Sequence, residues 1–178
     1  MAICGIDPGK HGAAVVLDVG KGFVAATGLV YSTPENTFNA GLLANFLSKH
    51  RPTVVVVERV RGRGGVWGAT QNFNFGYVYG QLMQTLRIMQ AVLHYEIAVV
   101  DPQVWQRFVY GKRPKDVPTK DAAAKAYGVL YPHAPLPTTP QGNTKDGIID
   151  ALLIAHWALY NHGNPKPIQG KRSKRHAK

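Results

Sequence analysis

The chain has 178 residues, 45% of them hydrophobic, and its 21 Lys and Arg against 10 Asp and Glu give a formal net charge of +11. This length predicts one domain with a proper core, and no apolar run approaches the ~20 residues that span a bilayer, which argues against a membrane partner. The single cysteine excludes an internal disulfide and favours a reducing, cytoplasmic compartment. The positive charge favours a polyanionic partner, most often nucleic acid.

The first predicted element is a β-hairpin over residues 3–17, in which two apolar segments flank a turn rich in glycine and proline. The chain enters this hairpin almost at once, which leaves no room for a signal peptide. Asp7 ends the first strand, where a charge is costly unless a metal, a hydrogen-bond network or solvent meets it. Gly9 and Gly12 would let a ligand approach closely. The alternative is a turn aspartate that caps its own loop.

Beyond the hairpin, strand and helix patterns alternate. Residues 23–31 are expected to add a third antiparallel strand. Residues 53–58 form a β-branched run typical of a strand buried on both faces, and this run also ends in a carboxylate, Glu58. A short strand is predicted over residues 97–100. Helices are expected from Thr33 or Asn36 to residue 50, over residues 69–95, 104–109 and 121–130, and from Asn143 or Thr144 to residue 161.

These elements predict an α/β domain over residues 1–165, with a mixed sheet and helices on both faces. Residues 166–178 form a basic tail that we expect to be disordered. The helix over residues 69–95 is unusually rich in apolar residues at helical spacing. Such a stripe is usually core, and its surplus could form a dimer interface. The stripe includes Phe73, Tyr77, Leu82, Leu86, Met89 and Leu93.

Two basic loops are candidates for contact with nucleic acid. Residues 59–68 hold three arginines (Arg59, Arg61 and Arg63), four glycines and Trp67, which suits phosphate contacts and stacking on a base. The alternative is a solvated loop with its tryptophan folded back on the body. The second loop, over residues 111–118, contributes Lys112, Arg113 and Lys115.

Four carboxylates form the candidate catalytic constellation. Asp7 and Glu58 end apolar strands, and Asp146 and Asp150 lie four residues apart on the last helix, so the helical pair shares one face. Like charges at that spacing repel each other, and a divalent cation is an economical compensation. Mg²⁺ prefers oxygen ligands, and two such ions about 4 Å apart can clamp the oxygens of an in-line phosphoryl transfer. The pattern therefore points to a metal-dependent nuclease.

Each carboxylate also has a simpler interpretation. Asp146 lies in the first turn of a helix, where the dipole alone favours an acid. Glu58 could form a salt bridge with Arg59 or Arg61. Asp150 sits among apolar residues, where an unpaired buried charge would be costly, so this interpretation is weakest there. Asp101 precedes a proline at a helix start, which is common cap chemistry, and we interpret it as a cap.

The order of these motifs resembles the RuvC-type Holliday junction resolvases, in particular their phage-like members, within the RNase H-like (retroviral integrase) superfamily. The likeness spans residues 2–160. It rests on Ile6-Asp7-Pro8-Gly9, Val57-Glu58, Phe73-x-Phe75-Gly76-x-x-x-Gly80, Asp101-Pro-Gln-x-Trp105, Lys120 at the next helix start, and Asp146-Gly-Ile-Ile-Asp150-Ala-Leu. Each motif alone is weak, but their order and spacing together are specific.

The resemblance implies a five-stranded mixed sheet, a homodimer, and a bacterial or phage-type host. It also implies a Mg²⁺- or Mn²⁺-dependent endonuclease with two ions per active site. Such a dimer nicks symmetric strands of a four-way DNA junction and leaves 5′-phosphate and 3′-hydroxyl ends. By the same resemblance, Trp67 or Phe73 is the aromatic residue that enters the junction.

The resemblance also assigns roles to the acids and to Lys120. Asp7 bridges the metals, Glu58 and Asp150 hold one each, and Asp146 assists. Lys120, with the arginines of residues 59–63, binds the DNA backbone near the scissile phosphate. Bacterial members separate their last two ligands by three residues, whereas the spacing here is four. This departure puts the role of Asp146, rather than that of Asp150, in question.

Other functions remain open. A fork or flap debranching nuclease of the same fold would share every acid, and a catalytically inactive junction-binding protein would share the fold and the charge. A transposase-type strand transferase would also fit, although no additional DNA-reading domain is visible. An actin- or sugar-kinase-like ATPase also opens with Gly-Ile-Asp-x-Gly. It needs two large lobes and a second phosphate loop, which 178 residues cannot supply.

Overall fold

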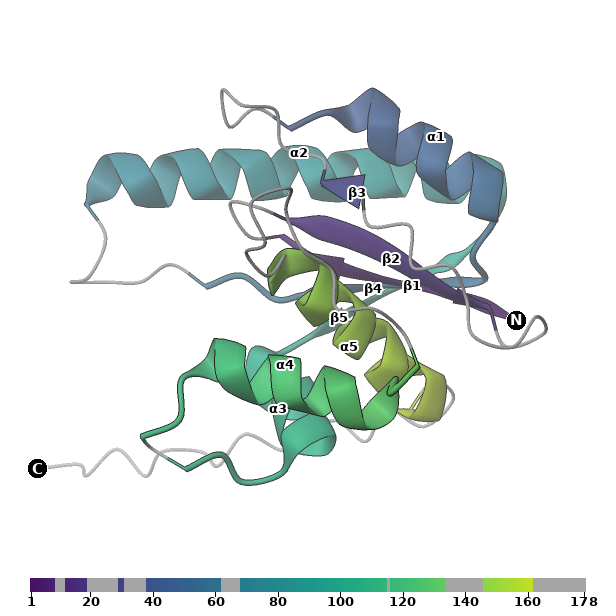
Figure 1. Ribbon diagram of the computed structural model, residues 1–178. Helices are drawn as coiled ribbons and strands as arrows, with labels where there is room; N and C mark the ends of the chain where they lie inside the picture. Colours follow the sequence, from purple (N-terminus) through teal and green to yellow (C-terminus); the bar gives the residue numbers. More distant parts are fainter. Residues whose placement is uncertain are drawn as a thin grey trace, which may run out of the picture.

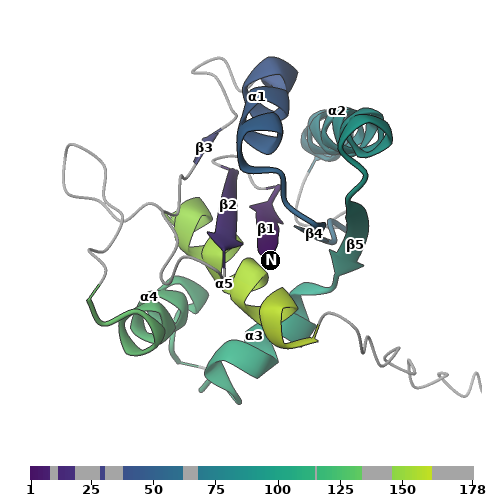
Figure 2. The same ribbon diagram turned by 90° about the vertical axis from the view of Figure 1, so that its right-hand side faces the viewer.

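The computed structural model describes residues 1–8, 12–18, 29–30, 38–61, 68–114, 116–133 and 146–161. Helices α1 and α2 cover one face of a single sheet, and α3, α4 and α5 lie on the other face, in both views (Figures 1 and 2). The strands are β1 (Ala2–Asp7), β2 (Ala13–Asp18), β3 (Leu29–Val30), β4 (Val54–Glu58) and β5 (Glu96–Val100). The helices are α1 (Ala40–His50), α2 (Ala69–Leu93), α3 (Pro102–Tyr110), α4 (Thr119–Leu130) and α5 (Asp146–Asn161).

The sheet is mixed, as the sequence predicted. Its order is β3-β2-β1-β4-β5, with antiparallel β1–β2 and β2–β3 pairs and parallel β1–β4 and β4–β5 pairs. Four strands have five or six residues, whereas β3, at the edge, has two. The third strand was expected over residues 23–31. Of these, Leu29 and Val30 form β3, and the others lie outside the described residues.

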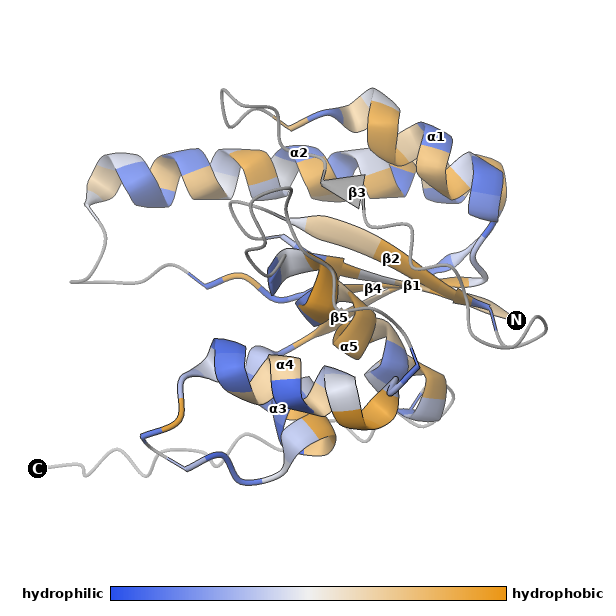
Figure 3. Cartoon of the chain, viewed as in Figure 1, coloured by the Kyte–Doolittle hydropathy of each residue, from blue (hydrophilic) through white to orange (hydrophobic). Residues whose placement is uncertain are grey.

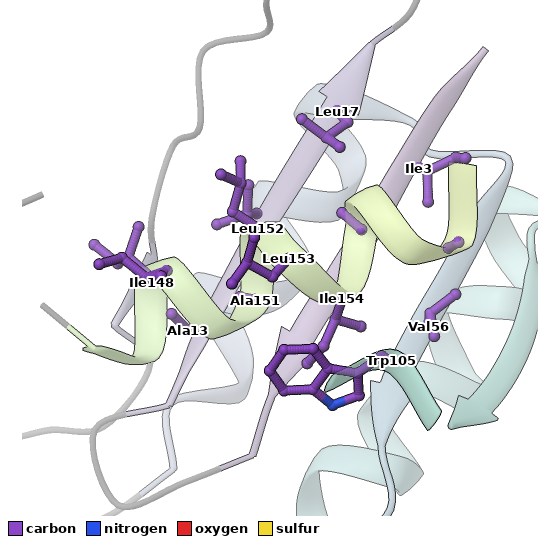
Figure 4. Packing of buried hydrophobic residues seen from close by; sticks show 14 of the residues in the cluster. Ile3, Ala13, Leu17, Val56, Trp105, Ile148, Ala151, Leu152, Leu153 and Ile154 are labelled. Atoms are coloured by element: carbon purple, nitrogen blue, oxygen red, sulfur yellow. The ribbon is translucent and has the colours of Figure 1, made fainter. Parts of the chain in front are cut away.

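Side chains alternate between the two faces of the sheet, and each face has its own core. Odd-numbered residues of β1 and even-numbered residues of β4 face α5, where they pack with its buried apolar side chains and with Trp105 of α3 (Figure 4). The intervening residues pack with buried leucines of α1 and α2. Hydropathy colouring shows α5 as apolar over its middle turns (Figure 3). By this alternation Asp7 and Glu58 belong to the face covered by α5.

Helix α5 lies directly against β1 at Gly5. A Cβ atom at Gly5 would stand 2.1 Å from the backbone oxygen of Ala151 and 2.5 Å from the backbone nitrogen of Ala155. Both contacts are with backbone atoms of a buried helix, so neither neighbour can rotate away. Only glycine therefore allows this approach. The approach places the first turns of α5 over the carboxyl end of β1 (Figure 1).

Two helix predictions need correction. The first helix was expected to start at Thr33 or Asn36, but α1 begins at Ala40, with Asn39 as its cap. The Leu42 backbone N–H donates to the Asn39 side chain at 3.0 Å. The predicted starts lie outside the described residues and share the capping chemistry of Asn39, so composition alone could not choose between them.

The stripe on α2 is core only in the helix's second half. Leu82 and Leu86 are buried, whereas Phe73 and Tyr77 are 71% and 60% exposed. The sheet ends before the helix does, so the first turns of α2 project beyond it (Figure 1).

No described helix, including α2, is long and apolar enough to cross a bilayer.

The close approach at Gly5 makes Gly5→Ala strongly destabilising. We expect a loss of about 2–4 kcal/mol in the free energy of unfolding, because α5 must move away from β1. Urea unfolding followed by circular dichroism measures this loss. Gly128→Ala is the matched control, because no described atom lies within 4 Å of an added Cβ in that turn of α4. An equal stability of Gly5→Ala and the unaltered protein would contradict the packing.

Candidate active site

Strands β1 and β4 bring Asp7 and Glu58 side by side. The parallel register pairs Ile6 with Val57, so the next residues of the two strands are neighbours. Adjacent strands lie about 4.8 Å apart, and both side chains belong to the face covered by α5. The sequence predicted both positions at strand ends, and the structure places those ends at one edge of the sheet.

Helix α5 adds Asp146 and Asp150 to this edge. Asp150 directly precedes Ala151, whose backbone rests on Gly5. Burial, together with the negative charges of Asp7, Glu58 and Asp146, raises the pKa of Asp150 from 3.8 to about 8. The carboxyl group of Asp150 is therefore in the field of the other three acids. The four acids predicted from the sequence lie at one location.

Lys120, at the start of α4, forms an ion pair with Asp146. The hydrogen bond and the charge of Asp146 raise the pKa of Lys120, and the lysine in turn lowers the pKa of Asp150. The lysine side chain is 75% exposed, so its ammonium group faces solvent as well as the acids. The predicted repulsion between Asp146 and Asp150 is therefore offset in part by a residue of the chain itself.

Glu58 accepts a hydrogen bond from Trp105. The indole Nε1–H of this fully buried residue donates to Glu58 Oε2 at 2.6 Å. The alternative interpretation paired Glu58 with Arg59 or Arg61, but within the described part of the chain the ion pairs of these arginines are with another acid. Both arginines pair with Asp101, at 3.6 Å from Arg59 Nε and 2.9 Å from Arg61 Nη2. The sequence indicates Trp105 only as part of a motif, and nothing in it pairs this residue with a carboxylate 47 residues earlier.

The interpretation of Asp101 as a helix cap is only half right. Asp101 occupies the cap position of α3, and Pro102 follows it as expected, but its side chain makes no capping hydrogen bond. The carboxylate instead holds the two arginines.

Tyr110, at the end of α3, is a residue of the site that the sequence did not single out. Its hydroxyl group is buried and has no hydrogen-bond partner within the described part of the chain. Its ring meets that of Trp105 edge to face, with centroids 5.9 Å apart. Burial and the charges of Asp150 and Glu58 raise the pKa of Tyr110, which places its hydroxyl beside the acids.

The acids fit a divalent cation in kind, but they are not assembled around one. Among the described residues, no three His, Cys, Asp or Glu side chains stand close enough to hold a metal ion. The predicted four-ligand arrangement is therefore not preformed. Carboxylates repel one another without a cation between them, and Asp146 is drawn to Lys120. The donor set itself, all carboxylate oxygens around a buried acid, is what Mg²⁺ or Mn²⁺ prefers.

The predicted DNA-contacting residues are only partly described. Arg59, Arg61, Lys112 and Arg113 are exposed, and Arg113 donates to the backbone oxygen of Val117. Phe73 is exposed on α2, where its ring stacks with Tyr77 at a centroid distance of 6.4 Å. Arg63, Trp67, Lys115 and the tail over residues 166–178 lie outside the described residues.

Comparison with known proteins finds a shared fold. No protein-family model matches the sequence, and no curated protein matches it significantly. Thermus thermophilus RuvC, solved in complex with Holliday junction substrate, superposes with a TM-score of 0.62 at 17% identity. That match covers 91% of this chain and 95% of RuvC. The chain has the fold of RuvC.

Two further structures share this architecture at lower similarity. The yeast mitochondrial Holliday junction resolvase Ydc2 gives a TM-score of 0.50 at 15% identity, covering 87% of this chain and 76% of Ydc2. The Fowlpox virus resolvase, solved with its substrate Holliday junction DNA, gives 0.50 at 15% identity over 91% and 99% of the two chains. The fold named by the sequence resemblance is thereby confirmed.

The raised pKa of Asp150 predicts how pH changes the stability of the metal-free protein. Between about pH 4 and pH 8 the unfolded chain ionises this carboxyl while the folded protein keeps it protonated, so stability falls as the pH rises through this window. We expect Asp150→Asn to be more stable than the unaltered protein by about 1–3 kcal/mol at pH 8, and less so toward pH 4. Urea unfolding in EDTA across this range measures the difference.

Asp116→Asn, in an exposed loop, is the control for the loss of one carboxylate. A stability difference between Asp150→Asn and the unaltered protein that stayed constant with pH would contradict the proposed environment of Asp150.

The unpartnered hydroxyl of Tyr110 predicts that Tyr110→Phe does not destabilise the protein. A buried polar group without a partner costs free energy, so its removal should raise the stability by up to about 1 kcal/mol. The control is Tyr95→Phe, because the buried Tyr95 hydroxyl donates to the Leu86 backbone oxygen at 2.6 Å. That variant should lose about 1–2 kcal/mol in thermal unfolding. A similar loss for Tyr110→Phe would show that its hydroxyl has a partner.

Proposed function

We propose that this protein is a structure-specific endonuclease that resolves four-way DNA junctions by paired, symmetric, metal-dependent nicks. The observation that carries the proposal is the buried acid Asp150, placed by the fold in the field of Asp7, Glu58 and Asp146. Its fold is that of proteins solved with Holliday junction DNA. The formal net charge of +11 supports a nucleic-acid substrate.

In this proposal the acids hold two divalent cations, Mg²⁺ or Mn²⁺. Asp7, at the end of β1, would contact both ions, with Glu58 and Asp150 holding one each and Asp146 assisting. When bound, the ions would activate a water molecule and stabilise charge on the phosphate. Attack on phosphorus and cleavage of the bond to O3′ would leave 5′-phosphate and 3′-hydroxyl ends.

The basic residues have separate tasks. Lys120 stands at the rim of the acids with its ammonium group exposed, where it can bind the scissile phosphate once a cation replaces it at Asp146. Arg59 and Arg61, with Arg63, Lys112, Arg113 and Lys115, would hold the backbone on either side. The exposed, paired rings of Phe73 and Tyr77 suit stacking on bases, a task for which Trp67 is the other candidate.

The exposed side of α2 supports a homodimer as part of the proposal. Phe73, Tyr77, Ile88 and Val92 are all more than half exposed and recur along one side of this helix. Gly76 and Gly80 lie on the same side, and no described atom comes within 4 Å of a Cβ added at either position. Glycine inside a helix costs about 0.5–1 kcal/mol, and no contact within the described chain requires it. A second copy packed closely on α2 would use both features.

The proposal predicts nicking of a synthetic four-way junction with Mg²⁺ but not with EDTA. Matched duplex, fork and flap DNA should be cut much more slowly, and the junction products should be symmetric and ligatable. Asp7→Asn should reduce the rate by about 10²-fold or more while retaining junction binding. Denaturing gels of end-labelled strands provide the measurement, with Asp116→Asn as control.

Two outcomes would replace the proposal. Equal cutting of forks and flaps would indicate a broader debranching nuclease. Tight junction binding without cutting under Mg²⁺ or Mn²⁺ would indicate an inactive junction-binding protein.

A further inference from the structure

The start of α3 lies beside the chain that leaves β4. The parallel register pairs Glu58 with Val100, and the Arg59 backbone N–H donates to the Val100 oxygen at 2.7 Å, which extends the ladder by one residue. Asp101 follows Val100 directly. The first turn of α3 therefore lies next to Glu58 and the arginines that follow it.

The first two turns of α3 provide one partner for the positively charged arginines and another for the negatively charged Glu58. The Asp101 carboxylate holds Arg59 and Arg61 through one oxygen atom, Oδ1. One turn later, Trp105 offers a neutral N–H to Glu58 at 2.6 Å. Arg59 and Arg61 thus pair with a carboxylate outside the cluster of acids, and one of the donors to the carboxylate of Glu58 is an uncharged N–H group.

We call this arrangement, in which Asp101 pairs with the arginines and Trp105 donates to Glu58, the sorting of the side chains. It matters because the arginines are close to Glu58 in sequence. A guanidinium group binds a carboxylate through two parallel hydrogen bonds, and Arg59 and Arg61 are one and three residues beyond Glu58. An arginine bound to Glu58 would occupy the oxygens that a cation needs. A tryptophan N–H occupies one oxygen lone pair and leaves the negative charge in place.

We propose that Asp101 and Trp105 are positioning residues that keep Glu58 available to a divalent cation. Asp101 holds Arg59 and Arg61 away from Glu58, and Trp105 fixes the orientation of the Glu58 carboxylate. The cation in this inference rests on the proposed function, whereas the sorting of the side chains does not.

Metal binding without DNA tests the role of Asp101. Asp101→Asn should raise the dissociation constant for Mn²⁺, measured by calorimetry, about fivefold, the factor that an ion pair of exposed residues is worth. Asp18→Asn is the control, because it removes one carboxylate at the opposite end of β1. Adding Arg59→Gln and Arg61→Gln to Asp101→Asn should restore the constant, since no arginine then competes. Equal constants for Asp101→Asn and Asp18→Asn would overturn the proposal.

DNA binding in EDTA separates this role from another one. If Asp101 only presented the arginines to DNA, Asp101→Asn would bind a four-way junction more weakly than Asp18→Asn. The proposal expects Asp101→Asn to bind at least as tightly, because the substitution removes one negative charge from a surface that faces DNA. Weaker binding by Asp101→Asn would overturn the proposal in favour of presentation.

The indole N–H signal of Trp105 provides a readout that needs neither metal nor cleavage. Trp105→Phe identifies the signal in ¹⁵N spectra, and Glu58→Gln should move it. Asp101→Asn should also move it, because an arginine then draws Glu58 away, and the triple variant should return it. An unmoved signal in Asp101→Asn would overturn the proposal even if the protein binds no Mn²⁺. Movement without Mn²⁺ binding would leave the sorting intact and reject the proposed function.

Discussion

The contact between the backbones of β1 and α5 at Gly5 determines how close the carboxyl groups of the helix lie to those of the strands. The absence of a side chain lets the helix rest on the strand, and Asp150 is the residue before the one that touches. A larger residue would raise α5 from the sheet and carry Asp150 away from Asp7. The chemistry proposed here therefore depends on a residue that contributes no functional group.

The same contact brings carboxyl groups close together, and residues of the neighbouring helices α3 and α4 interact with them. Four carboxyl groups at one edge of the sheet repel one another when ionised, and the burial of Asp150, together with this repulsion, raises its pKa. Lys120 of α4 and Trp105 of α3 each engage one of these acids. A cluster of carboxyl groups thus lies within a protein of high positive net charge, an arrangement that suits the cation and the polyanion of the proposed function.

The sequence was sufficient for the positions of the acids but not for their partners. Asp7 and Glu58 were predictable because each ends an apolar run, and Asp146 and Asp150 because of their spacing on a helix. The hydrogen bond from Trp105 and the pairing of Asp101 were not, because both depend on the register of β5 against β4. The exposure of Phe73 escaped prediction because helical periodicity does not reveal where the sheet beneath a helix ends.

The alternation along β1 and β4 ties the site to both cores. Ile6 and Val57 face one core, while Asp7 and Glu58, one residue later, face α5. Loss of a single residue within β1 would turn its carboxylate toward the apolar core beneath α1 and α2 and expose a side chain meant for that core. These strands can therefore vary by substitution, or by changes in length that keep the alternation of faces. A shift that moves the acids also moves the side chains of both cores.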